Sequence, residues 1–139
     1  MHGYQIGEQA RPYCFEATQL LNKLNSDAWP VQMLDLGCSY GMGSAFLKYG
    51  CSFDEIVAFY AARAPHDFAA CAEVTRMWLN VSPPACDVRC VGLDSSEPAI
   101  TFGLKAGLLD GGSVHAEDFV HRVTLDADAE MRGDVCQGQ

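Results

Sequence analysis

The sequence has few basic residues and no apolar run long enough to cross a membrane. Nine lysines and arginines stand against eighteen aspartates and glutamates, which gives a formal net charge of −9 at pH 7. Contacts to a phosphate backbone need clustered lysine and arginine, so this balance argues against nucleic acid as the main partner. A transmembrane helix needs roughly 20 successive apolar residues, and a signal peptide needs a basic start before an apolar core. Residues 1–11 have neither feature, and we expect no membrane partner.

Paired cysteine motifs are also missing. No two of the seven cysteines form a C-x-x-C pair; they are Cys14, Cys38, Cys51, Cys71, Cys86, Cys90 and Cys136. Cys86 and Cys90, taken together with His115 and His121, match no common zinc-ligand spacing, so we expect no metal site. Several cysteines fall in apolar segments, where a thiol behaves as a small hydrophobic side chain. These features favour a reduced, cytoplasmic protein.

What the sequence does contain is an apolar strand followed by a glycine-rich turn, VQMLDLGCSYGMG, from Val31 to Gly43. The apolar run over residues 31–36 predicts a buried parallel strand, and Asp35 lies near its carboxyl end. Gly37, Gly41 and Gly43 predict a tight turn into a helix. Glycine accepts a positive φ there and allows a ligand to approach the backbone closely.

Two common phosphate-binding patterns do not fit this turn. A Walker loop ends in Gly-Lys-Ser/Thr, whereas this turn ends in Gly-Met-Gly-Ser, without a lysine. A dinucleotide fingerprint reads G-x-G-x-x-G, whereas the glycines here follow G-x-x-x-G-x-G. The remaining alternatives are a different nucleotide-type ligand, or a glycine-rich connection that binds nothing.

The rest of the chain predicts alternating helices and strands. Residues 88–94 read as a second strand that ends in Asp94, and residues 113–119 read as a third. Between the first two strands, the segment 52–84 reads as a helical insertion; it opens with the capping box of Ser52 and Glu55. A helix is expected from Tyr13 to Asn25, with Pro12 in its first turn and an extended arm before it. Another follows Asp94, with Ser96 as its N-cap and its end near residue 106.

Asp35-x-Gly37-x-x-x-Gly41 resembles the first motif of the class I S-adenosylmethionine (SAM)-dependent methyltransferases, with Ser39 where a middle glycine is usual. The acid at the end of the second strand strengthens the resemblance, since Asp94 offers two acceptor oxygens for two ribose hydroxyls. The resemblance implies a SAM site, and it implies that Asp118 and Phe119 lie against the adenine. The expected SAM-binding residues are Asp35, Gly37, Cys38, Ser39, Gly41, Asp94, Ser95, Asp118 and Phe119.

The resemblance covers residues 13–119, which correspond to the N-terminal half of the family's domain. It implies an α/β fold with a Rossmann-like parallel sheet and flanking helices, truncated after the third or fourth strand. We therefore expect residues 1–139 to form one domain that is incomplete at its C-terminal end. The segment from Tyr4 to Pro12 is similar to a segment that precedes the core in some bacterial methyltransferases. It is expected to be either part of a lid or an ordinary N-terminal arm.

The expected function is methyl transfer from SAM to a small-molecule acceptor, with no residue assigned as a catalytic base. A second hypothesis is a non-catalytic SAM-binding or interaction module. A third, a nicotinamide-dinucleotide-binding unit, is disfavoured by the glycine spacing. An unpaired edge of the first strand, from Val31 to Leu36, would seek a partner. We therefore expect either a homo-oligomer or a piece of a longer protein.

Overall fold

A computed structural model describes residues 6–24, 30–63, 67–81 and 84–117. In these parts of the chain, helices and strands follow one another in the order α1 (Ile6–Leu24), β1 (Val31–Leu36), α2 (Met42–Leu47), α3 (Phe53–Arg63), α4 (Phe68–Asn80), β2 (Val88–Leu93), α5 (Glu97–Ala106) and β3 (Gly111–Ser113). The protein is therefore of mixed α/β type. None of the described helices is long and apolar enough to span a membrane.

The three strands form one parallel sheet in the order β1-β2-β3. Its register pairs Val31 with Val88 and Leu36 with Leu93, so the carboxyl ends of β1 and β2 lie level with each other. Parallel neighbours require crossover connections, which α2 to α4 and α5 provide. The predicted open parallel sheet with flanking helices and with a helical insertion between its first two strands is confirmed.

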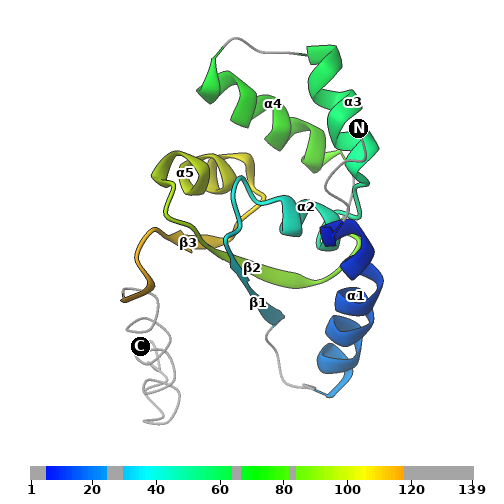
Figure 1. Ribbon diagram of the computed structural model, residues 1–139. Coiled ribbons are helices and arrows are strands. Elements are labelled where there is room, and N and C mark those ends of the chain that lie inside the picture. The colour runs from blue at the N-terminus through cyan, green and yellow to red at the C-terminus, as the bar shows by residue number, and fades with distance from the viewer. Residues whose placement is uncertain (1–5, 25–29, 64–66, 82–83, 118–139) are drawn as a thin grey trace, which may run out of the picture.

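The helices build two layers on the same side of the sheet (Figure 1). α2 and α5 pack directly on it, through Leu47, Ile100 and buried strand residues such as Cys90. The inserted helices α3 and α4 pack on α2 and α5 through a second cluster, which includes Phe46 and Phe102. The predicted capping box begins α3. Glu55 Oε2 accepts a hydrogen bond from the Ser52 N–H (2.7 Å), and Ser52 Oγ accepts one from the Glu55 N–H (3.2 Å).

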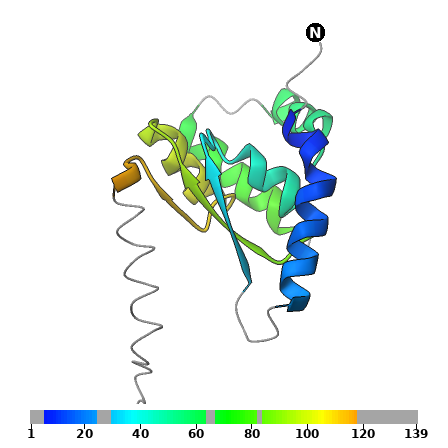
Figure 2. The same ribbon diagram turned by 60° about the horizontal axis from the view of Figure 1, so that its bottom comes forward.

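The opposite face of the sheet carries no helix of the described chain. Along β1 the side chains alternate between half-buried and exposed, and the outward positions include Leu34 and Leu36. In Figure 2 the strands lie in front, with α2, α4 and α5 behind them. A parallel sheet is normally covered on both faces, so a face that the described part of the chain leaves bare is unusual.

The predicted start of the first helix was wrong. The first helix begins at Ile6 rather than Tyr13, so residues 6–12 are helical and not extended. Pro12 lies inside α1, where it lacks the N–H that would bond to the carbonyl group of Glu8. Tertiary packing explains the longer helix: a Cβ on Gly7 would lie 2.9 Å from the Phe46 ring, so glycine allows α1 to approach α2 closely.

The third strand was also misplaced. It was expected at residues 113–119, but β3 spans Gly111–Ser113 and overlaps the expected strand only at Ser113. Gly111 and Gly112 pair with Val91 and Gly92 of β2. A Cβ on Gly112 would lie 2.9 Å from Ile100 Cγ2, so glycine is needed here for close packing of β3 under α5. Turn propensity alone could not reveal that role.

Candidate functional site

The candidate site lies at the carboxyl ends of the parallel strands, where open α/β sheets commonly bind ligands. The turn that follows β1 is fastened to the end of β2, because the Gly37 N–H donates a 2.7 Å hydrogen bond to the carbonyl oxygen of Leu93. The Cys38 N–H shares the same acceptor at 3.4 Å. The glycine turn and the tip of β2, which carries Asp94, are thereby held next to each other.

The turn contains three residues with left-handed backbone conformation. Gly37 has φ = 70°, Ser39 has φ = 49° and Gly41 has φ = 89°. Glycine adopts this region without steric cost, which explains the residue type at positions 37 and 41. Ser39 is the one described non-glycine residue with a positive φ. It occupies the position at which the methyltransferase motif usually has its middle glycine.

Asp94 connects the turn to the start of α5. One carboxylate oxygen, Oδ2, accepts a hydrogen bond from the Ser39 N–H, and the other, Oδ1, accepts one from the Ser96 N–H; both are 2.8 Å long. These bonds, first that from Ser96 and then that from Ser39, lower the pKa of Asp94 below its ordinary value. The side chain is therefore a fixed anion at neutral pH, and it is only partly covered by the protein.

A shallow hollow of about 260 Å³ opens beside Asp94. It is lined by Gly37, Leu93, Asp94, Ser95, Val114 and Ala116. Three of these residues were predicted as ligand-binding, and they come from two segments of the chain. The apolar Leu93, Val114 and Ala116 were not predicted, because a short apolar residue at a strand end has no pattern that separates ligand contact from packing.

Asp35 adds a second negative charge that is close enough to Asp94 to interact with it. Burial raises the pKa of Asp35, and the charge of Asp94 raises it further, so the two carboxylates repel each other. Asp35 packs against the first turn of α2, where a Cβ on Gly43 would collide with its carboxylate. Gly43 therefore makes room for the acid. Within the described residues, the Asp35 carboxylate has no hydrogen-bond donor of its own.

Two predicted site residues, Cys38 and Gly41, pack against the core. Cys38 is 3% exposed, and its sulfur occupies the space above Gly92. Burial raises the pKa of the Cys38 thiol to about 11, with Asp35 and Asp94 adding to the effect, so the group is a neutral packing side chain. Gly41 is buried against Leu108, where a Cβ would lie 2.9 Å from that side chain.

The remaining predicted residues, Asp118 and Phe119, lie outside the described part of the chain. The structure thus brings Asp35, Gly37, Ser39, Asp94 and Ser95 to one end of the sheet, and it places the Cys38 side chain below it. Among the residues that the structure describes, no group of histidine, cysteine and acidic side chains is arranged to hold a metal ion. Comparisons with protein-family models, with curated proteins and with solved structures gave no match.

Proposed function

We propose that the protein binds SAM at the carboxyl ends of β1 and β2, and that it transfers the methyl group to a small-molecule acceptor. The observation that carries this proposal is the position of Asp94. Its carboxylate stands at the end of the second strand, tied to the glycine turn by the 2.8 Å bond from Ser39 and bordering an open hollow. This is the place and the residue type that a ribose diol requires.

The carboxylate of Asp94 retains capacity for a ligand. Two carboxylate oxygens offer about four lone-pair sites, and the N–H groups of Ser39 and Ser96 use two of them. The other two sites are available to a pair of adjacent hydroxyls. Because both protein bonds come from backbone groups, the acid is already oriented before a ligand arrives, which reduces the entropy lost on binding.

The charge of the site favours a cationic ligand over a dinucleotide. Asp35 and Asp94 are both acids, and no lysine or arginine lines the hollow within the described chain. SAM carries a sulfonium and an ammonium group, which such a site attracts. A nicotinamide dinucleotide would bring a doubly charged pyrophosphate next to these carboxylates. Its phosphates would also need backbone N–H groups, yet those of Gly37 and Cys38 are already bonded to Leu93.

The chemistry that SAM supplies is an electrophilic methyl group on its sulfonium. The protein's task is then chiefly positional. Asp94 fixes the ribose and Asp35 attracts the cationic end, so that an acceptor can attack in line with the bond that breaks. Apart from Asp94, which is assigned to the ribose, no side chain that lines the described hollow has the character of a general base. That observation favours, as the second candidate function, a SAM-binding module without catalytic activity.

Calorimetric titration with SAM and with NAD tests the proposal. We expect saturable binding of SAM and none of NAD. Asp94→Ala should weaken SAM binding by at least 10-fold, since a hydrogen bond to a charged group contributes roughly 1.5–3 kcal/mol. Asp67→Ala is the matched control, because the Asp67 carboxylate also accepts two backbone N–H groups, at the start of α4. Binding of NAD instead of SAM, or equal SAM affinity in Asp94→Ala, would contradict the assignment.

Methyl transfer is tested separately from binding. The release of S-adenosylhomocysteine from SAM in the presence of a panel of small hydroxyl, thiol and amine acceptors measures turnover. Acceptor-dependent release supports the enzyme, whereas tight SAM binding without release supports the non-catalytic module.

A further inference from the structure

A second, larger cavity lies between the inserted helices and the layer beneath them. It has a volume of about 450 Å³. Its walls come from every helix from α2 to α5 and from the glycine turn, and they include Tyr40, Tyr60, Phe68, Thr75, Trp78 and Phe102. The space is partly open to solvent, and a mostly apolar hollow of this size with a few polar groups is the kind of place where small molecules bind.

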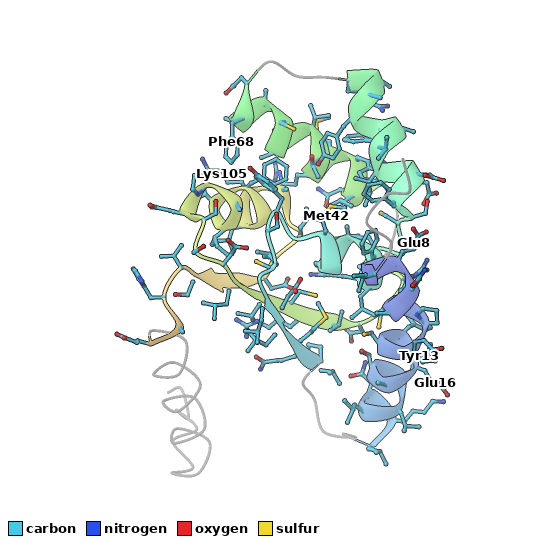
Figure 3. All side chains as sticks on the ribbon, viewed as in Figure 1. Glu8, Tyr13, Glu16, Met42, Phe68 and Lys105 are labelled. Carbon is cyan, nitrogen blue, oxygen red and sulfur yellow. The ribbon has the colours of Figure 1, made fainter. Side chains whose placement is uncertain are left out.

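Aromatic rings shape this cavity. The Tyr40 and Phe102 rings stand edge to face with centroids 5.5 Å apart, and the centroids of the Phe68 and Phe102 rings are also 5.5 Å apart. Figure 3 shows Phe68 directed from α4 toward α5. Rings in such arrangements present both edges and faces, with which a further planar ring can pair favourably. Among the described residues, no lysine or arginine takes part in the lining, so no cationic side chain balances the charge of an anionic ligand there.

One pair of hydroxyl groups provides a polar point in these apolar walls. The Tyr60 Oη and Thr75 Oγ1 atoms are 2.7 Å apart, and Thr75 Oγ1 donates its hydrogen to the carbonyl oxygen of Cys71 at 2.8 Å. Thr75 must then accept from Tyr60, because its only hydrogen is already used. The phenolic oxygen of Tyr60 keeps its own lone pairs, and it is therefore a hydrogen-bond acceptor without a remaining donor hydrogen.

Asp67 also lines the cavity, at the start of α4. Its carboxylate oxygens accept hydrogen bonds from the N–H groups of Ala69 and Ala70, as the N-cap of α4. Burial raises the pKa of Tyr60, which keeps its hydroxyl protonated, as the bond to Thr75 requires.

We propose that the cavity between α2, α3, α4 and α5 binds a neutral, planar aromatic molecule that carries one O–H or N–H group, and that this group donates a hydrogen bond to Tyr60 Oη. The volume suits a bicyclic ring system. This site is distinct from the hollow beside Asp94, and the proposal does not depend on SAM binding.

The test uses the full-length protein with indole and with 1-methylindole, which have the same ring system but differ in the N–H donor. Titrations followed by two-dimensional ¹H–¹⁵N NMR measure weak affinities directly. We expect saturable binding of indole, with shifts centred on residues 60, 71 and 75. 1-Methylindole should bind at least fivefold more weakly. Absence of saturable indole binding, or shifts confined to other regions, would overturn the proposal.

Two variants locate the site. Cys71→Phe puts a ring into the cavity and should weaken indole binding at least 10-fold. Met77→Phe, at a 62%-exposed position on the same helix, should leave it unchanged. Tyr60→Phe keeps the ring but removes the acceptor, so indole and 1-methylindole should then bind within twofold of each other. Tyr60→Phe keeps the test valid if Cys71→Phe does not fold. A persistent preference for indole in Tyr60→Phe would contradict the assigned hydrogen bond.

Discussion

At the residue level, Gly37 and Gly107 share a backbone conformation, but they differ in whether they lie at the candidate site. Gly37 and Gly107 have nearly the same left-handed backbone, with φ values of 70° and 77°. A Cβ on Gly37 would meet nothing within 4 Å, and one on Gly107 would only touch Arg76 at 4.0 Å. Both tolerate a side chain sterically, but only Gly37 lines the hollow beside Asp94.

We therefore predict that Gly37→Val abolishes measurable SAM binding, while Gly107→Val leaves it intact. Each substitution forces an L-residue into the left-handed region, which costs about 1–2 kcal/mol, and somewhat more for a β-branched side chain. Thermal unfolding should show similar losses for both variants, and calorimetry should separate them. Equal SAM affinities in the two folded variants would show that the glycine turn is only a connection.

The raised pKa of Asp35 predicts a gain in stability when its charge is removed. An acid whose pKa is higher in the folded than in the unfolded protein lowers stability as the pH rises between the two values, and the full penalty remains at neutral pH. Asp35→Asn should therefore raise the melting temperature at pH 7.5 by a few degrees, and it should weaken SAM binding. The gain should shrink toward pH 4, near the ordinary pKa of aspartate, about 3.9.

The control for this prediction is Asp87→Asn, which removes an exposed aspartate just before β2. Its melting temperature should follow that of the parent protein at each pH. If Asp35→Asn has a lower melting temperature than the parent protein at pH 7.5, the Asp35 carboxylate stabilises the fold. The buried charge would then not lower stability for the sake of ligand binding.

At the level of elements, local signals predicted β1, β2 and the capped helices because each has a signature within a few residues. Ser96 accepts from the Ala99 N–H as expected for an N-cap, and β2 ends at Leu93, one residue before the predicted end at Asp94. The start of α1 and the position of β3 depend on glycines that pack against Phe46 and Ile100. Such contacts join distant segments, so a single sequence does not reveal them.

The same difference between local sequence signals and contacts of distant segments applies to the site. Asp94 was identified because an acid at the end of an apolar strand must lie at the carboxyl end of the sheet. Cys38 was assigned to the ligand, yet its side chain packs over Gly92, since alternation of side chains no longer applies once the strand has ended. The aromatic cavity was not predicted, because its walls come from five separate segments, including Tyr40 and Phe102.

We predict that the capping box of Ser52 and Glu55 stabilises the start of α3. Ser52→Ala removes the acceptor for the Glu55 N–H and should lower the free energy of unfolding by about 1 kcal/mol, as measured by urea denaturation. Glu55→Gln keeps an acceptor for the Ser52 N–H and should cost less. Ser52 also holds the pKa of Glu55 below its ordinary value, so the loss in Glu55→Gln should diminish as the pH falls toward 4. An unchanged urea midpoint in Ser52→Ala would mean that packing alone holds this end of α3.

At the level of the whole molecule, the described residues cover the sheet on one side only. Within the described residues β1 pairs with β2 alone, so its outer edge offers unpaired N–H and C=O groups. The bare face next to this edge includes Leu34, 42% exposed, and Leu36, 69% exposed. Parallel sheets are normally buried on both faces, and open apolar edges recruit other strands.

We propose that copies of the chain associate through this edge and face of β1. Sedimentation velocity at low micromolar concentration should therefore show a dimer or a larger species. Leu34→Glu places a charge on the bare face and should weaken association at least 10-fold. Leu104→Glu is the matched control, because Leu104 is also 42% exposed but belongs to α5, on the covered side of the sheet. The control should sediment like the parent protein. A parent protein that stays monomeric, or a Leu104→Glu variant that dissociates as Leu34→Glu does, would show that the exposed β1 surface does not mediate association. In the expected case, burying Leu34 and Leu36 between two copies removes their apolar surface from water at roughly 25 cal/mol per Å², and it supplies the sheet with the second cover that its parallel strands require.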